Sequence, residues 1–202
     1  MHISEGVLSA PILLSGAVLA GVGTAIGLRR IAYDRLMTVA MLSAAFFVGS
    51  LIHVPVGPSN VHLVLNGLLG ALLGWSAFPA ILVALLLQAL LFQYGGLTIL
   101  GVNTFNMAFP AVLCHLFFTP MLRRPGTLRA VGGFCCGFFA ILLAGLLTAL
   151  SLAATDEGFL RAAQLILLAH VPIMVVEGVV TAMAVSFLAR VRPELLAGIS
   201  GK

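Results

Sequence analysis

Met1 and His2 together carry three nitrogen donors within one short stretch of chain. The α-amine, the amide nitrogen of His2 and its imidazole can chelate one metal ion through two fused rings. Loss of the amide proton requires a metal that favours planar nitrogen coordination, such as Ni(II), Cu(II) or, less readily, Co(II). We expect Met1 to be retained, because methionine excision generally requires a small second residue. A fourth nitrogen would then close the coordination plane.

Further polar side chains interrupt the apolar stretches of the chain. They are His53, His62, Asn103, Asn106, His170 and the carboxylate of Glu177. Histidine is the commonest protein ligand for transition metals, whereas magnesium or calcium would call for several carboxylates. The fifth histidine, His115, is interpreted as structural or interfacial. The polar groups therefore indicate a transition metal.

Glu177 follows His170 by seven residues, which places both on nearly one face of a helix, with Met174 and Thr181 on the same face. Two interpretations stay open for this face. It is either a packing and hydrogen-bonding seam, or it lines an ion path and supports ligand orientation. His53 is likewise either a ligand at the mouth of the path or a capped surface histidine.

The composition fixes the class of protein that must position these groups. Of the 202 residues, 61% are apolar and only 8% are charged, against about 25% charged in a typical soluble domain. The mean hydropathy is +1.20. These values predict an integral membrane protein and exclude a soluble globule, a disulfide scaffold and a disordered chain. Glu5 and Pro11 do not fit a signal peptide, so we expect the N-terminus to remain on the chain.

The apolar stretches predict an all-α, polytopic membrane protein with seven transmembrane helices, forming one transmembrane substrate-binding domain over residues 1–202. Continuous apolar runs favour helices over a barrel. The predicted spans are Val7–Leu28, Met37–His53, Val61–Trp75, Phe78–Tyr94, Asn103–Leu122, Ala130–Ala153 and Ala162–Ala189.

The basic residues predict the orientation of these spans. Nine of the ten lie in three regions that seven spans place on one side: Arg29, Arg30, Arg35, Arg123, Arg124, Arg129, Arg190, Arg192 and Lys202. Arg161 alone falls on the other side. The positive-inside rule then puts the N-terminus outside and the C-terminus in the cytoplasm. It also explains the pI near 9.5 without nucleic acid as a partner.

Small residues recur every four positions in the first predicted span. The two series are Gly16, Ala20 and Thr24, and Ala17, Gly21 and Ala25. Such faces let another helix approach closely. Intramolecular packing and docking to a partner membrane subunit both stay open.

Several segments resemble the CbiM/NikM family, the substrate-binding membrane components of energy-coupling-factor (ECF) transporters for cobalt and nickel. Residues 1–6, Met-His-Ile-Ser-Glu-Gly, resemble the family's Met-His-Ile-x-(Asp/Glu)-Gly opening. Residues 58–63, Pro-Ser-Asn-Val-His-Leu, resemble its Gly-Thr-Ser-x-His-Leu segment, and residues 101–107 its Gly-x-Asn-x-x-Asn-Met segment. The last helix matches at 170–172 and 177–181. One departure is residues 57–62, Gly-Pro-Ser-Asn-Val-His, where the family often has Gly-Gly-Thr-Ser-Gly-His.

The resemblance implies a role for each matching residue. The Met1 amine, the His2 amide nitrogen and the His2 imidazole would be three metal ligands, and His62 the fourth. Ser59, Asn60, Asn103 and Asn106 would orient ligands or hold the loop over the site.

The resemblance also implies how the protein works. It would take up Co2+ or Ni2+ as transported substrate, with no permanent cofactor, across a bacterial or archaeal cytoplasmic membrane. Because no GxxxxGK[ST] motif is present, ATP hydrolysis would belong to separate cytoplasmic ATPase subunits. A membrane coupling (T) subunit and a small accessory membrane subunit would complete the transporter. The alternative is a self-sufficient secondary carrier, against which the lack of a repeat and the single intramembrane carboxylate argue.

Overall fold

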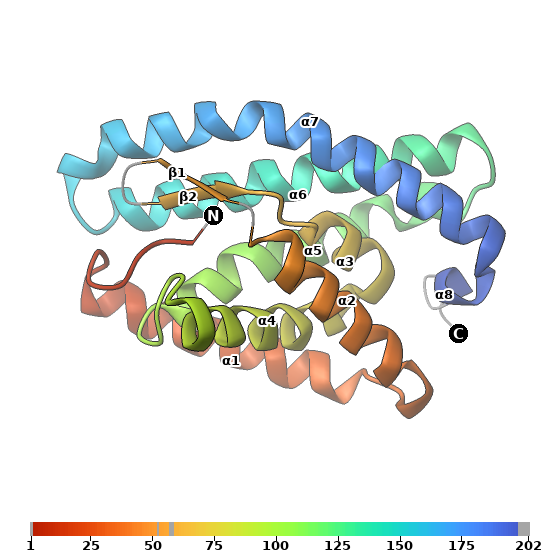
Figure 1. Ribbon diagram of the computed structural model, residues 1–202, viewed down its shortest axis with the longest axis horizontal. Helices are drawn as coiled ribbons and strands as arrows, with labels where there is room; N and C mark the ends of the chain where they lie inside the picture. Colours follow the sequence, from red (N-terminus) through yellow and green to blue (C-terminus); the bar gives the residue numbers. More distant parts are fainter. Residues whose placement is uncertain (1, 52, 57–58, 198–202) are drawn as a thin grey trace.

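The computed structural model is a bundle of long helices with a small β-hairpin packed among them (Figure 1). The structure describes residues 2–51, 53–56 and 59–197, and gives the backbone alone for 53–56, 59–62 and Glu157. The helices are α1 (Ala10–Arg29), α2 (Leu36–Gly49), α3 (Asn66–Leu73), α4 (Ala77–Phe92), α5 (Leu100–Leu122), α6 (Thr127–Ala153), α7 (Leu160–Val191) and α8 (Pro193–Ala197). Short 3-10 turns are η1 (Tyr33–Arg35), η2 (Gly74–Ser76) and η3 (Glu157–Phe159).

A β-hairpin replaces parts of the second and third predicted spans, Met37–His53 and Val61–Trp75. α2 ends at Gly49, and the antiparallel strands β1 (His53–Val56) and β2 (Ser59–His62) follow it. The helical predictions are wrong at these ends. Pro55 and Pro58 lack a backbone N–H and disfavour helix in the residue before them, so they break a helix even within an apolar stretch.

Helix α3 descends from the hairpin alongside α5. At its start, the Asn66 side chain donates a hydrogen bond to the Met107 carbonyl (3.2 Å). At the turn beyond its end, Gly74 lies against His115, whose Nε2 would be 3.0 Å from an added Cβ. Both pairs are in the same order along the chain, so α3 and α5 run parallel.

Helix α4 returns toward the other end of the bundle. Gly74 has a φ of +54°, in the region that favours glycine, and begins the η2 turn between α3 and α4. The turn after α4 contains Gly95, where an added Cβ would lie 3.1 Å from Nδ2 of Asn103 near the start of α5. One apolar stretch therefore folds as a helical hairpin.

Among the described residues, five helical segments are long and apolar enough to cross a membrane. Four are the single helices α1, α5, α6 and α7, and the fifth joins α3, η2 and α4 over Asn66–Phe92. The eight residues of α3 rise only about 12 Å, well short of the roughly 30 Å hydrocarbon core. The count of seven spanning helices is therefore not confirmed.

The first small-residue face of α1 packs inside the molecule. Gly16, Ala20, Gly23 and Gly27 are buried, and an added Cβ on Gly27 would lie 2.5 Å from the Trp75 carbonyl. An added Cβ on Gly21 would meet nothing within 4 Å. The face with Gly16 thus serves intramolecular packing, while Gly21 is on the outer surface.

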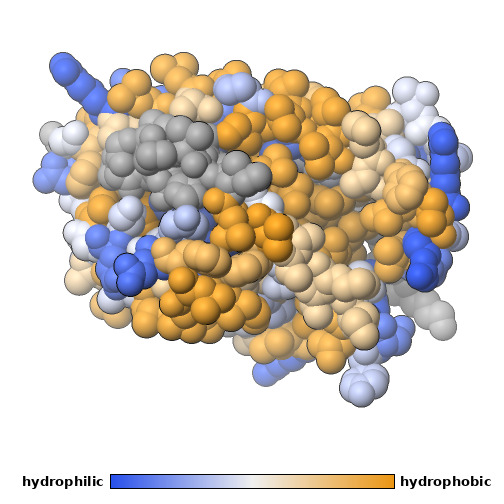
Figure 2. All heavy atoms as spheres, viewed as in Figure 1, coloured by the Kyte–Doolittle hydropathy of each residue, from blue (hydrophilic) through white to orange (hydrophobic). Residues whose placement is uncertain are grey.

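Charged residues gather at the two ends of the bundle and leave an apolar belt between them (Figure 2). The α1–α2 connection, the α5–α6 connection and the end of α7 lie together at one end (Figure 1). They carry eight of the nine arginines and lysines that the sequence predicts on one side; the ninth, Lys202, lies outside the described residues. Arg161 opens α7 at the opposite end.

Candidate metal site

The N-terminal segment is held inside the bundle by a side chain of α5. The Ile3 N–H donates to Oδ1 of Asn103 at 3.0 Å, and Nδ2 of Asn103 donates to the Ile3 carbonyl at 3.1 Å. Asn103 thereby satisfies both backbone groups of Ile3, which would be costly to bury without partners. His2 is 3% exposed and Ile3 is fully buried. The predicted ligand His2 is thus held at a fixed depth, and Met1 lies outside the described residues.

A second attachment joins Glu5 to the turn between α4 and α5. The Glu5 N–H donates to the Gly95 carbonyl at 3.1 Å, and Oε1 of Glu5 accepts from the hydroxyl of Thr98 at 2.9 Å and its N–H at 3.2 Å. Sequence reasoning missed the part played by this turn. The Gly95–Gly96 pair after an apolar run is a turn signal that could have revealed it.

This turn also packs directly against His2. Gly95 has a φ of +79°, and an added Cβ there would lie 3.8 Å from Cδ2 of His2 and 3.1 Å from Nδ2 of Asn103. At Gly96, with a φ of +147°, an added Cβ would lie 2.6 Å from the Glu5 carboxylate. Both glycines are therefore required by backbone conformation and by close approach to the N-terminal segment.

The β-hairpin brings His53 and His62 opposite each other. The register pairs His53 with His62, Pro55 with Asn60 and Val56 with Ser59. Opposite residues of antiparallel strands have Cα atoms about 4.5–5.5 Å apart. The structure thus brings these candidate residues into one small element, which the sequence analysis did not predict, while their side chains lie outside its described part.

Glu177 fixes the junction between the hairpin and α3. It is fully buried on α7, and its Oε1 accepts hydrogen bonds from the N–H groups of Val64 and Leu65, the second at 2.7 Å. Non-helical backbone at membrane depth requires internal partners for its polar groups. One carboxylate oxygen supplies them here, so Glu177 positions the segment that follows His62.

The α7 face that contains Glu177 is buried. His170, Met174, Glu177 and Thr181 are between 0% and 3% exposed. Nδ1 of His170 lies 2.6 Å from the Ile166 carbonyl. In the described residues, Nε2 of His170 and Oε2 of Glu177 are buried with no hydrogen-bond partner. Oγ1 of Thr181 is a third such atom, so the face combines a packing seam with three polar atoms that have no partner among the described residues.

Asn106 lies apart from the N-terminal attachment. Its Nδ2 donates to Oγ of Ser151 at 3.2 Å and so joins α5 to α6. Asn103, three residues earlier, bonds to the N-terminal segment instead. The structure separates the two asparagines into different roles, although the sequence pattern treats them alike.

The chemistry available here is nitrogen ligation rather than a carboxylate cage. Within the described part of the chain, no three His, Cys, Asp or Glu side chains come together in a way that could hold a metal ion. A site that draws on the backbone nitrogen and imidazole of His2 does not require such a cluster. A hard cation would call for several carboxylate ligands, which the described residues do not bring together.

Comparison with known proteins agrees with this chemistry. Residues 2–195 match the CbiM family, described as the cobalt uptake substrate-specific transmembrane region. A putative metal transport protein of Haemophilus influenzae is 43% identical over 199 residues, covering 97% of each chain. A putative fused nickel transport protein, NikMN, of Archaeoglobus fulgidus is 30% identical and matches 97% of this chain and 68% of its own length.

A solved structure matches the whole fold. The crystal structure of a transition metal transporter superposes with a TM-score of 0.81 at 27% identity, covering 98% of this chain and 97% of that one. The fold and the family match together define a multi-pass membrane component for cobalt or nickel transport. The chain belongs to the CbiM family.

Proposed function

We propose that this chain is the substrate-specific membrane component of an ECF-type transporter and captures Co2+ or Ni2+ at the outer face. The amine of Met1, the amide nitrogen and imidazole of His2, and the imidazole of His62 are the four ligands. The observation that carries this proposal is the burial of His2 next to Ile3, whose backbone is bonded on both sides by Asn103. Because this segment is already ordered before metal binds, binding loses less conformational entropy.

The hairpin supplies the fourth nitrogen in this proposal. His62 ends β2, and the next residues are fixed by Glu177. Ser59 and Asn60 lie on the same strand and support the loop, whereas His53 lies opposite His62 at the mouth of the path. His170, with its unpartnered Nε2, supports the site from α7. Since the nitrogens must lose protons to bind metal, affinity falls in acid.

We propose seven crossing segments, with the N-terminus outside and the C-terminus in the cytoplasm. In this proposal the third crossing combines the β-hairpin with the short helix α3, because the eight residues of α3 are too short alone. The arginine-rich end of the bundle then faces the cytoplasm, as the positive-inside rule requires. Residues 1–202 form one transmembrane substrate-binding domain in the cytoplasmic membrane of a bacterium or archaeon.

Energy comes from other subunits in this proposal. Separate cytoplasmic ATPases hydrolyse ATP, and a membrane coupling subunit transmits the change to this chain, which catalyses no reaction itself. The fused relative NikMN supports an additional small membrane subunit as a partner. The rival is a secondary carrier, which would transport metal in vesicles that lack the ATPases. Uptake of radioactive Ni2+ that requires both ATP and the ATPases favours the ECF-type assignment.

Calorimetric titration of the purified protein with Ni2+ and Co2+ tests the ligand set. We expect a few residues added before Met1 to abolish tight binding, while the same residues added after Lys202 leave it unchanged. We expect His62→Ala to lose most of the affinity and His53→Ala, on the opposite strand, to lose much less. Native-like binding by the N-terminally extended protein would show that the α-amine is not a ligand.

A further inference from the structure

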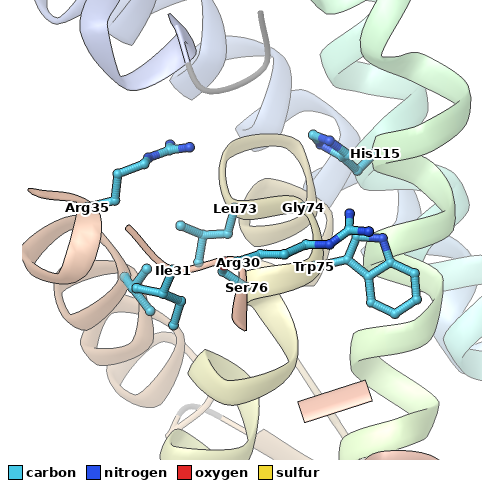
Figure 3. A pocket seen from close by; sticks show the side chains of 9 residues that line it. Arg30, Ile31, Arg35, Leu73, Gly74, Trp75, Ser76 and His115 are labelled. Atoms are coloured by element: carbon cyan, nitrogen blue, oxygen red, sulfur yellow. The ribbon is translucent and has the colours of Figure 1, made fainter. Parts of the chain in front are cut away.

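A basic cavity lies at the arginine-rich end of the bundle, far from the N-terminal segment. Its volume is about 170 Å3. Arg30 follows α1, Arg35 lies in η1, and His115 projects from α5, and all three line the cavity around the η2 turn (Figure 3). Side chains from three separate elements thus surround one space.

Both arginines are held in place, and neither is neutralised by a described carboxylate. The Arg30 guanidinium lies 5.4 Å from the centroid of the Trp75 ring. Nη2 of Arg35 lies 3.2 Å from the Leu72 carbonyl and 3.4 Å from that of Leu195, as donor to both. Arg35 and Arg30 each retain further N–H donors, since a guanidinium carries five. The cavity therefore presents ordered positive charge that lacks a counterion within the described protein.

An apolar groove lies next to this cavity. It has a volume of about 370 Å3 and shares Ile31 and Val39 with the basic cavity. Its walls come from the end of α1, from α2 and from α4. Several lining side chains are exposed on the membrane-facing surface, among them Leu28 at 57%, Leu36 at 51% and Leu87 at 41%. A charged compartment and an apolar one thus lie next to each other and share two wall residues.

We propose that this pair of compartments binds an anionic phospholipid, with its phosphate in the cavity of Arg30 and Arg35 and an acyl chain in the groove. Arginine forms paired, charge-assisted hydrogen bonds with phosphate oxygens. Basic pockets between transmembrane helices at a membrane interface recognise anionic headgroups. The position of the groove beside the cavity, with Ile31 and Val39 in both walls, favours an amphiphile over a free anion, since a free anion needs no apolar compartment.

The bound lipid would contact three neighbouring elements of the bundle. Its phosphate would contact Arg30 and Arg35, and its acyl chain would cover Ala40 and Ala44 of α2 and Val83 of α4. The lipid thus contributes to the packing of α1 and α2 against α4. The basic cavity lies at the opposite end of the bundle from His2 and the turn at Gly95, so we expect phosphate binding there to leave metal capture unchanged.

Native mass spectrometry and thermal unfolding of the purified protein test this inference. Phosphatidylglycerol, phosphatidylcholine and inorganic phosphate are added separately. We expect retention of phosphatidylglycerol, a rise in melting temperature with it, and little effect of the other two. Arg30→Gln and Arg35→Gln should each weaken lipid binding about fivefold, from about 1 kcal/mol per basic residue. Arg124→Gln, an exposed arginine at the same end that lines neither compartment, is the matched control.

A separate substitution tests the acyl-chain groove. Ala44 is exposed on the groove wall, so Ala44→Phe fills the acyl compartment without entering the core. We expect it to reduce phosphatidylglycerol binding and to leave the melting temperature in phosphatidylcholine unchanged. Equal losses in Arg124→Gln and Arg35→Gln would overturn the site in favour of general surface charge. Inorganic phosphate that stabilises as well as the lipid, with Ala44→Phe inert, would also overturn the phospholipid assignment.

Discussion

Asn103 and Ile3 exchange two hydrogen bonds across one hundred residues of sequence, at 3.0 and 3.1 Å. The side-chain amide of Asn103 takes the place of a neighbouring strand for the backbone of Ile3. Ile3 directly follows His2, so this pair sets where the histidine lies. A helix residue thereby controls the position of a chain terminus, which by itself would be mobile.

Asn103→Ala should weaken Ni2+ binding without unfolding the bundle. The substitution removes two hydrogen bonds worth about 1 kcal/mol each, so the affinity for Ni2+ should fall roughly thirtyfold. Asn106→Ala is the control, because Asn106 bonds to Ser151 and not to the N-terminal segment. Titration calorimetry gives the affinity, and melting temperature monitors the fold. Unchanged affinity in Asn103→Ala would show that the attachment is dispensable.

Gly96→Ala should displace Glu5 and lower both metal affinity and stability. The added Cβ would meet the Glu5 carboxylate at 2.6 Å, and the φ of +147° is strained for alanine. Gly6→Ala separates the two effects: its φ is +80°, but an added Cβ meets nothing within 4 Å. Strain alone costs about 1–2 kcal/mol. Gly96→Ala should lower the stability measured by thermal unfolding by more than Gly6→Ala does. Equal losses of stability in the two variants would argue against the contact with Glu5.

Glu177→Ala should leave the buried N–H groups of Val64 and Leu65 without an acceptor. Each unsatisfied group costs about 1–3 kcal/mol, so the melting temperature should fall clearly. Glu177→Gln retains an oxygen acceptor and should recover much of the stability. If the carboxylate positions the hairpin, Ni2+ affinity will follow the same order as stability. Identical behaviour of the two variants would contradict this role.

Gly137→Ala should disrupt the contact between α6 and α7. An added Cβ would lie 2.4 Å from the Glu177 carbonyl and 2.7 Å from Oγ1 of Thr181. Overpacking of this kind costs about 1–3 kcal/mol. At Gly145, on the same helix, the nearest atom is the flexible end of Leu167 at 3.3 Å. The melting temperature of Gly145→Ala should therefore stay close to that of the native protein. If Gly145→Ala lost as much stability as Gly137→Ala, the loss would not come from the contact between α6 and α7.

Much of the helical framework could be predicted from the sequence. The predicted spans Phe78–Tyr94, Asn103–Leu122, Ala130–Ala153 and Ala162–Ala189 differ from α4, α5, α6 and α7 by at most three residues at either end. Continuous apolar runs of this length have few alternatives in a membrane, because helix satisfies the backbone within one segment. The buried face of α7 with His170 and Glu177 also follows from helical spacing alone.

The hairpin could not be predicted from hydropathy. The predicted spans stop at His53 and resume at Val61 with no element between them, yet two strands form over His53–Val56 and Ser59–His62. The segment that follows them is fixed by Glu177, more than one hundred residues later, which accepts hydrogen bonds from the N–H groups of Val64 and Leu65. A partner so distant in sequence gives no local signal.

The sequence by itself determined the membrane class, the sidedness of charge along the chain and the residue types available as ligands. These depend on composition and on spacing within single elements, where local physics is sufficient. Only the tertiary structure decided that Asn103 holds the N-terminal segment while Asn106 does not, and that Arg30 and Arg35 share a cavity. Such contacts join distant elements, so they exist only once the helices have packed.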